Sequence, residues 1–376
     1  MQEKNLSDVL QILVTASAMV TENSSDPNYD FYVSIIDNSA FWLALAVSGF
    51  ILALVIVVGN ALLLFTIYKD PRKSLRSPPC LLIANLSASD LLQGLVSVSF
   101  VALRDVYRFE QVHMPYVVVI KAVIYTVLTT TLFVSSYSII AMSFTCYVAI
   151  NNPMEYKSVI TKRRVKIFIA VLWVISLTTC VLPVTNISEK TYTLIYLHTH
   201  ASLPAILLTV IYINVFRALA RRSRELQVNR ISAIVSSKHV LERERKMTFT
   251  IIIILGLFYV SYMPQYVTLH LLHLCDSCQQ SITFHKIDVI LSRFLFLSSA
   301  INPFIYAWRV PKYRLALIEC LKMCRKKMQR SQTQGRSALF GRLKREQTVR
   351  GSRVNFLLNT DKSRKNNNAS SDSTSV

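Results

Sequence analysis

The chain has 376 residues, of which 52% are hydrophobic and only 17% are charged. A soluble domain carries about 25% charged residues, and charge is what a lipid bilayer excludes. The formal net charge is nevertheless +21, so the charged residues must be concentrated outside the hydrophobic segments. This composition favours a membrane protein and argues against a soluble globular enzyme.

The motif content narrows the function further. The seven cysteines are scattered along the chain, which argues against a small domain held together by disulfides. The sequence contains no GxGxxG, no Walker A string and no HExxH, so the common phosphate-binding loops and the zinc-protease helix are absent. No set of residues points to catalysis, and we predict that the protein is not an enzyme.

Seven segments reach the length of about 20 predominantly apolar residues that a membrane helix needs. They are Phe41–Tyr68, Pro79–Leu103, Ala122–Met154, Ile167–Ser188, Thr191–Phe216, Met247–Cys275 and Phe284–Trp308. The last segment contains Lys286, Asp288 and Arg293, so hydropathy alone leaves a six-span alternative open.

The loops between these segments alternate in charge. Those at 69–78, 148–166 and 217–246 are rich in lysine and arginine, whereas the intervening loops are close to neutral. Basic loops of this kind stay in the cytoplasm. Asn-x-Ser glycosylation sequons begin at Asn5 and Asn23 in the acidic N-terminal tail and at Asn186 in a near-neutral loop. We therefore predict a plasma-membrane protein with an extracellular N-terminus and a cytoplasmic C-terminus.

The same pattern divides the chain into four parts. We expect residues 1–40 to form an extracellular tail, 41–308 the transmembrane bundle, 309–328 an amphipathic helix on the membrane surface, and 329–376 a disordered cytoplasmic tail. In the first part, the apolar stretch Val9–Val20 is either the core of a cleaved signal peptide or a piece of the tail. Cys320 and Cys324 lie four residues apart on the amphipathic helix and are candidates for palmitoylation.

Short motifs follow one another on the predicted helices in a fixed order. They are Gly59-Asn60 on the first helix, LLIANLSASDLL at 81–92 on the second, Trp173 on the fourth, Pro204 and Tyr212 on the fifth, Phe258 and Pro264 on the sixth, and Asn302-Pro303-Phe-Ile-Tyr306 on the seventh. Together they resemble the rhodopsin-like (class A) G-protein-coupled receptors over about residues 41–326.

The resemblance implies an all-α membrane protein, a seven-transmembrane helix bundle with a short amphipathic eighth helix. It also implies a receptor that transduces an extracellular ligand signal to heterotrimeric G proteins and binds arrestin. A transporter or channel would require inverted repeats or more charge in the interior, and the sequence has neither.

A carboxylate at mid-bilayer depth, such as Asp90, is costly unless polar groups surround it. The resemblance supplies these groups as a sodium pocket, formed by Asp90, Ser135, Ser298, Ser299 and Asn302. The alternative is a hydrogen-bonded cluster without an ion. No other cofactor is implied, and retinal is not expected because Phe296 stands where an opsin has its retinal-linking lysine.

The resemblance also identifies residues that would rearrange on activation, namely Thr145, Cys146, Tyr147, Tyr212, Glu244, Tyr262, Pro264, Asn302, Pro303 and Tyr306. Thr145 and Cys146 depart from the family's Asp-Arg-Tyr motif, and Glu244 thereby loses its arginine partner. A thiol cannot replace a guanidinium fork. The alternative function is therefore an atypical receptor that does not couple and instead acts as a scavenger or as a scaffold for arrestin or PDZ proteins.

The cysteine pattern also departs from most of the family. Lys121 occupies the position of the third-helix cysteine, so the usual disulfide to the second outer loop is missing. Cys275 and Cys278 are candidates for a local disulfide in the third outer loop. These features weakly resemble the branch of melanocortin, cannabinoid and lysophospholipid receptors, although melanocortin receptors lack the proline found here at Pro204.

The sequence does not name the ligand. Leu128 stands where an amine receptor has an aspartate, so a biogenic amine is not expected. The pocket candidates are the polar residues of the outer half, namely Lys121, Tyr125, Thr129, Tyr196, His200, Gln265, Tyr266, His270 and Arg293. Lys121 and Arg293 favour an anionic ligand, unless Lys121 reaches the headgroups and Arg293 pairs with Asp288.

The cytoplasmic tail suggests three kinds of partner. Its basic residues favour anionic membrane lipids, and nucleic acid is not expected. Serines and threonines from Thr348 onward are candidates for phosphorylation and arrestin binding. The end of the chain, Ser373–Val376, resembles a PDZ ligand, with a hydroxyl at Thr374 and a carboxylate at Val376.

Overall fold

The computed structural model describes residues 36, 38–70, 73, 75–112, 118–179, 195–228, 234–309, 311–323, 325–326 and 329. The chain divides into two units, Met1–Leu317 and Ile318–Val376. Within the described ranges every regular element is a helix. The predicted all-α fold is thereby confirmed for this part of the chain.

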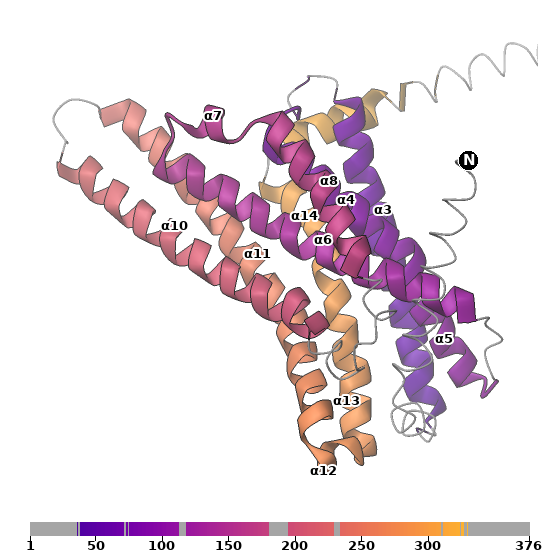
Figure 1. The fold of residues 1–376 in the computed structure, drawn as a ribbon. Coiled ribbons are helices and arrows are strands. Elements are labelled where there is room, and N and C mark those ends of the chain that lie inside the picture. The colour runs from indigo at the N-terminus through magenta and orange to yellow at the C-terminus, as the bar shows by residue number, and fades with distance from the viewer. Residues whose placement is uncertain are drawn as a thin grey trace, which may run out of the picture. The chain divides into compact units, whose positions relative to one another are not determined.

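The helices follow one another along the first unit (Figure 1). They are α3 (Ser39–Lys69), α4 (Pro78–Leu92), η1 (Gln93–Val98), α5 (Ser99–Phe109), α6 (Val118–Asn151), α7 (Tyr156–Val159), α8 (Lys162–Thr179), η3 (His198–Ser202), α10 (Leu203–Val228), α11 (Ile234–Leu274), α12 (Asp276–Gln279), α13 (Ile282–Ser292), η4 (Arg293–Phe296) and α14 (Leu297–Arg309). Residues 311–323 are also helical. The one-turn helices α7 and α12 lie at opposite ends of the bundle.

Five helical segments of the described part are long and apolar enough to cross a membrane. They are Ser39–Lys69, Pro78–Phe109, Val123–Asn151, Ile195–Arg221 and Ile282–Trp308. The helix α8 is shorter and begins with basic residues, and α11 contains the uncharged run Met247–Leu274. Each of the seven predicted spans thus overlaps a helix, including the seventh, although residues 180–188 of the fourth and 191–194 of the fifth lie outside the described residues.

The second span is longer than predicted. It was expected to end at Leu103, because Arg104 and Asp105 resemble loop residues, but the helix continues without a break through η1 and α5 to Phe109. Asp105 is fully buried. The prediction of a loop from 104 onward was wrong because this charge is compensated inside the protein rather than by water.

Several helices contain irregular turns or prolines. The segments η1 and η3 are π-helical, which is a wider turn than the α-helix. Pro204 follows η3 almost directly, and a wide turn can accommodate the backbone hydrogen bond that a proline cannot make. Pro264 and Pro303 lie inside α11 and α14, as the sequence indicates.

Two glycines let α3 approach its neighbours closely. A β-carbon at Gly49 would lie 2.9 Å from the β-carbon of Ala102 on α5. One at Gly59 would lie 3.1 Å from Cγ of Pro303 on α14. Small residues at helix contacts are typical of membrane helices, where close backbone approach replaces the hydrophobic effect.

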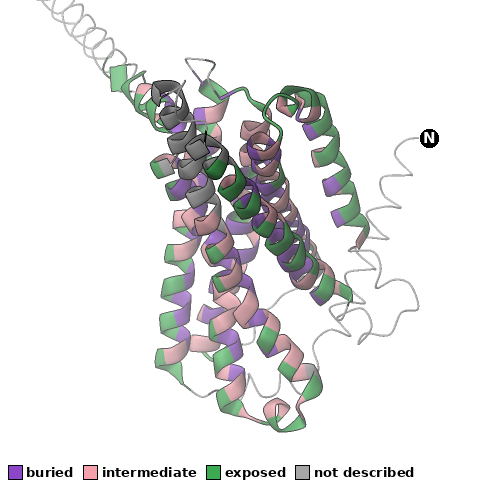
Figure 2. Cartoon of the chain, turned by 90° about the vertical axis from the view of Figure 1, so that its left-hand side faces the viewer, coloured by how far each residue is buried: buried purple, intermediate pink, exposed green. Residues whose placement is uncertain are grey.

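Apolar side chains lie on both the inner and the outer surfaces of the bundle. The largest buried cluster contains Cys146, Tyr212, Phe258 and Tyr306. Large apolar residues are also exposed along α3, namely Leu43, Val47, Phe50, Ile51, Leu54 and Val58. Figure 2 shows buried residues on the faces that the helices turn toward one another and exposed residues on the outer faces. Continuous exposed apolar surface of this kind fits contact with lipid.

Candidate functional site

Asp90 is at the centre of a buried polar network that joins three helices. Ser135 Oγ of α6 and Ser299 Oγ of α14 donate hydrogen bonds to Oδ1 of Asp90, over 3.1 and 2.8 Å. Asn302 Nδ2, also of α14, donates to Oδ2 over 3.0 Å. The carboxylate itself is fully buried. Three of the four predicted partners therefore contact Asp90 directly, and Ser298 is buried beside Ser299.

Gln93 is a member of this network that the sequence analysis missed. Ser299 Oγ lies 2.7 Å from Oε1 of Gln93 as well as within reach of Asp90, although one hydroxyl has only one hydrogen to donate. Nε2 of Gln93 is buried and has no partner among the described residues. Rotating the amide by half a turn would let Nε2 donate to Ser299, whose hydrogen would then go to Asp90. The spacing of three residues from Asp90 on one helix face could have revealed Gln93.

The donor set around Asp90 fits a small, hard cation. It offers carboxylate, hydroxyl and amide oxygens, which are the ligands such cations prefer. The network is buried, so a cation would compensate the carboxylate away from bulk water. The side chains that contact Asp90 are hydroxyls and an amide, with neither histidine nor cysteine among them, so the donors are not those that zinc prefers.

A second buried polar cluster links α4, α6 and α8. Trp173 Nε1 donates to Oδ1 of Asn85 over 2.9 Å, and Asn85 Nδ2 donates to Ser138 Oγ over 2.9 Å. Nearby, Asn60 Nδ2 of α3 donates to the carbonyl oxygen of Ser299 over 3.0 Å. These bonds give Asn60 and Trp173 of the motif pattern a structural role, because each forms a hydrogen bond between two helices in the bundle interior.

The predicted pocket residues fall into a buried and a half-buried group. Thr129, His200 and Gln265 are buried, whereas Tyr125, Tyr196, Tyr266 and His270 are half-buried. The rings of Tyr196 and His200 lie 4.0 Å apart, and those of Tyr266 and His270 lie 4.1 Å apart. The side chain of Lys121 lies outside the described residues.

Arg293 has a partner that the sequence analysis did not predict. Its Nη2 lies 2.7 Å from Oδ2 of Asp105, and the side chains are 13% and 0% exposed. Asp288, which the sequence offered as an alternative partner, accepts a hydrogen bond from Gln265 Nε2 over 3.0 Å. Asp105 belongs to a helix rather than to a loop, and this brings its carboxylate inside the bundle, beside Arg293 at the start of η4.

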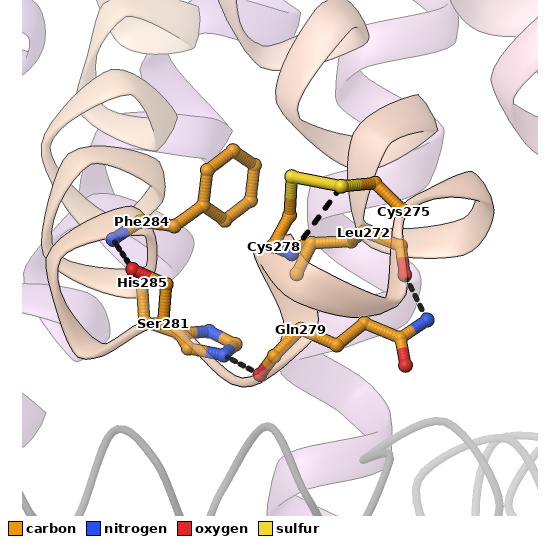
Figure 3. Close-up of a disulfide and its surroundings, with 7 residues drawn as sticks. All are labelled: Leu272, Cys275, Cys278, Gln279, Ser281, Phe284 and His285. Carbon is orange, nitrogen blue, oxygen red and sulfur yellow. Dashed lines mark hydrogen bonds between the residues drawn. A yellow bond between two sulfur atoms is a disulfide. The ribbon is translucent and has the colours of Figure 1, made fainter.

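Cys275 and Cys278 form a disulfide at the start of α12 (Figure 3). Next to it, Gln279 Nε2 donates to the carbonyl oxygen of Leu272 over 2.7 Å, and Nε2 of His285 lies 2.8 Å from the carbonyl oxygen of Gln279. The turn between α11 and α13 is thus held by a covalent bond and by side-chain contacts to its backbone.

At the opposite end of the bundle, Cys146 is buried where the family has arginine. It is 9% exposed and belongs to the same apolar cluster as Tyr212 and Tyr306. Thr145 Oγ1 donates to the carbonyl oxygen of Met142 over 2.8 Å, so this hydroxyl is satisfied within its own helix. Tyr147 is half-buried.

The remaining switch residues lie in the core of the bundle. The rings of Tyr262 and Phe258 are stacked, with centroids 4.5 Å apart. Tyr212 Oη lies 3.4 Å from Ser143 Oγ, and Tyr306 Oη donates toward Sδ of Met142 over 3.7 Å. The side chain of Glu244 lies outside the described residues.

Several predicted modification sites fall outside the described part of the chain. These are the sequons at Asn5, Asn23 and Asn186, the cysteine Cys324 and the C-terminal residues Thr374–Val376. Cys320 lies within the described residues, and its side chain is buried.

The comparison with known proteins agrees with this geometry. Residues 59–306 match the family described as 7 transmembrane receptor (rhodopsin family). The adenosine receptor A2a of Canis lupus familiaris is 22% identical over 293 residues, which cover 70% of this chain and 68% of that receptor. The histamine H2 receptor of Cavia porcellus is 26% identical over 295 residues, which cover 72% and 77% of the two chains.

These relatives are receptors rather than enzymes, and neither belongs to the melanocortin, cannabinoid or lysophospholipid receptors, so that branch stays a prediction. The family match covers more than half of the chain and includes the Asp90 network, both internal prolines and Tyr306. This chain therefore belongs to the rhodopsin family of seven-transmembrane receptors.

Proposed function

We propose that this receptor transduces an extracellular ligand signal to heterotrimeric G proteins. The observation that carries the proposal is the Asp90 network, which joins α4, α6 and α14 through buried hydrogen bonds. Asn302 of the network directly precedes Pro303, where α14 lacks a backbone hydrogen bond. Because packed helices shift between discrete arrangements, a ligand that moves their outer ends would bias this network.

The described pocket residues favour a small, polar and uncharged ligand. Thr129, His200 and Gln265 offer hydrogen-bonding groups in a largely buried setting, with aromatic rings beside them. The charge of Arg293 is compensated by Asp105, which weakens the case for an anionic ligand at this position. The names of the relatives refer to adenosine and histamine; Leu128 stands where amine recognition needs an acid, which leaves a nucleoside-like molecule as the better probe.

Sodium is the ion that we assign to the Asp90 network. The monovalent charge balances the single carboxylate, and the surrounding hydroxyl and amide oxygens complete a site for a hard cation. Bound sodium would hold α4, α6 and α14 at one separation. The alternative, a network closed by hydrogen bonds alone, makes stability independent of sodium.

Cys146 supports a second candidate, an atypical receptor that does not couple to G proteins. An arginine at this position would offer a guanidinium to an incoming partner, whereas the buried thiol adds only a small apolar group to the cluster around Tyr212 and Tyr306. Such a receptor would act as a ligand scavenger or as a scaffold for arrestin or a PDZ protein. Whether or not the receptor couples, a phosphorylated tail would bind arrestin and the Thr374–Val376 end would bind a PDZ protein.

The decisive experiment measures basal and stimulated dissociation of heterotrimeric G proteins across the Gα classes in cells. Wild type, Cys146→Arg and Cys146→Ser are compared at matched surface expression, with pools of nucleosides, amines, lipids and peptides as stimuli. We expect wild type and Cys146→Ser to activate the same Gα class.

Cys146→Ser is the matched control, because it removes the thiol without adding a charge. Silence of wild type and of Cys146→Ser, together with signalling by Cys146→Arg, would contradict coupling and support the scaffold. Arrestin recruitment to the three variants would then be the next measurement.

A further inference from the structure

Two histidines from different helices face each other at the end of the bundle that carries α12. His198 is the first residue of η3, and His270 lies one turn before the end of α11. Their ring centroids are 5.6 Å apart, with an angle of 60° between the planes. A hydrogen bond of 2.8 Å from Ser202 Oγ to the Tyr266 hydroxyl joins the same two helices one turn further in.

The hydrogen bonds fix the same tautomer in both rings. Nδ1 of His270 lies 2.9 Å from the carbonyl oxygen of Tyr266, which can only accept, so Nδ1 carries the hydrogen. Nδ1 of His198 lies 2.9 Å from Ser202 Oγ, whose single hydrogen goes to Tyr266. Ser202 therefore accepts from His198, and Nδ1 of that ring also carries the hydrogen. In both neutral rings Nε2 is left with its lone pair.

A lone pair on Nε2, with Nδ1–H held by an oxygen, is the state in which histidine binds a transition metal. Zinc binds imidazole nitrogen at about 2.0–2.1 Å with tetrahedral angles, which would put two ring centroids on one ion about 5 Å apart. The observed 5.6 Å is close to this separation. His198 is exposed and His270 is half-buried, so the His198 ring is the one with room to turn toward a shared ion.

We propose that His198 and His270 form a two-histidine site for a transition-metal dication, with Zn²⁺ as its principal ligand. In the described part of the chain no third histidine, cysteine or carboxylate completes a cluster. With two protein ligands, the site would bind zinc reversibly and more weakly than a structural zinc site, which has four. Bound zinc would fasten η3 to α11 and fix the separation of the fifth and sixth spans at this end of the bundle.

Ser202 is a positioning residue of this site. It accepts from His198 and donates to Tyr266, whose carbonyl oxygen in turn holds His270. One serine thus connects the orientation of the two rings. Loss of such a partner of a metal-bound histidine typically weakens metal affinity by about 10–100-fold.

The test is zinc binding to the purified full-length receptor at pH 7.5, followed by calorimetry and by the unfolding temperature, with Mg²⁺ as the comparison ion. His198→Asn and His270→Asn keep a polar group near the position of Nδ1 but lack Nε2. His239→Asn, at the opposite end of α11, is the matched control.

We expect saturable zinc binding and a zinc-dependent rise in unfolding temperature for wild type and for His239→Asn. Each Asn variant of the pair should shift the zinc midpoint at least tenfold, and Ser202→Ala about tenfold. Ser202→Ala retains both histidine ligands. It therefore tests whether the orientation of the rings matters for zinc binding, even if a histidine variant unfolds.

Absence of saturable zinc binding by wild type would overturn the proposal, as would an unchanged midpoint in both His198→Asn and His270→Asn. A response to Mg²⁺ equal to that with Zn²⁺ would also overturn it. The measurement uses neither an activating ligand nor a G protein, so its outcome is independent of whether the receptor couples.

Discussion

Two buried carboxylates, Asp90 and Asp105, are stabilised in different ways. Asp90 accepts hydrogen bonds from neutral hydroxyl and amide groups, whereas Asp105 contacts the guanidinium of Arg293. A buried charge is costly unless it is paired or hydrogen-bonded. We therefore expect substitution of the two residues to have different effects. At Asp90 it would remove the proposed sodium ion, and at Asp105 it would leave the positive charge of Arg293 without its carboxylate.

Replacing Asp105 by alanine should be strongly destabilising. The change leaves the guanidinium of Arg293 in a mostly buried position without its carboxylate, which typically costs about 3–5 kcal/mol. The unfolding temperature of the purified receptor measures the effect. Glu110→Ala, at an exposed carboxylate just beyond α5, is the matched control.

The double variant Asp105→Leu with Arg293→Leu should recover much of the loss, because it removes both charges. Equal unfolding temperatures for Asp105→Ala and Glu110→Ala would contradict the assigned ion pair.

Replacing Asp90 by asparagine should abolish stabilisation by sodium. A ligand that binds only the folded protein raises its unfolding temperature with concentration, so wild type should be more stable in sodium chloride than in an equal concentration of a bulky organic cation chloride. Without the carboxylate the site loses its charge, and the difference should disappear.

The neighbouring serines provide the comparison for this prediction. Ser299→Ala should weaken the sodium response, since Ser299 contacts both Asp90 and Gln93, whereas Ser298→Ala should leave more of it. A sodium response in Asp90→Asn equal to that of wild type would show that the ion binds elsewhere.

Prediction from sequence was good for Asp90 and three of its partners, but it missed two other buried polar residues of the second span. A lone acid in an apolar run must be buried with polar partners, and the family resemblance named Ser135, Ser299 and Asn302. Gln93 was missed although it lies three residues from Asp90, whereas recognising Asp105 requires the register after η1 and the true end of the second span. Local spacing does not contain that information.

At the scale of the helices, close packing depends on particular glycines. Gly49 faces Ala102 on α5, whose β-carbon is attached directly to the backbone and cannot turn aside. Gly256 on α11 has no atom within 4 Å of the position that its β-carbon would take. The two glycines allow the same substitution to be tested with and without a neighbour.

Gly49→Ala should lower the unfolding temperature, because the added methyl group would lie 2.9 Å from the Ala102 β-carbon. Overpacking of this kind costs about 1–3 kcal/mol. Gly256→Ala should be neutral or slightly stabilising, since alanine is favoured over glycine within a helix by up to about 1 kcal/mol. A larger loss for Gly256→Ala than for Gly49→Ala would show that α3 and α5 do not pack as described.

The presence of the helices was largely predictable, since each predicted span overlaps a helix. Apolar length identifies a span whatever its neighbours are. The ends were less predictable, as the second span shows. A charged residue near the end of an apolar run usually marks the place where the helix leaves the membrane. Asp105 does not mark the end here, because Arg293 on another helix compensates its charge.

At the scale of the whole molecule, the chain is a multi-pass protein of the plasma membrane. The distribution of lysine and arginine predicts which loops face the cytoplasm. This part of the prediction does not depend on any contact inside the bundle. It is therefore tested in cells rather than in purified protein.

An epitope tag at the N-terminus should be accessible to antibody on intact cells, whereas a tag at the C-terminus should become accessible only after permeabilisation. Treatment with an N-glycosidase should increase the electrophoretic mobility, and the combined change of Asn5, Asn23 and Asn186 to glutamine should abolish that shift. Exposure of the C-terminal tag on intact cells would reverse the orientation.

The wide turn η1 also constrains which kinds of mutation the second span tolerates. A π-turn contains one residue more than an α-helical turn, so everything after it is rotated by about 100° relative to a regular helix. Deleting one residue within Gln93–Val98 would restore the regular helix and swing Asp105 off the face that meets Arg293. In this segment, then, the number of residues is under a stricter constraint than their identity, and a one-residue deletion should be more damaging than most substitutions.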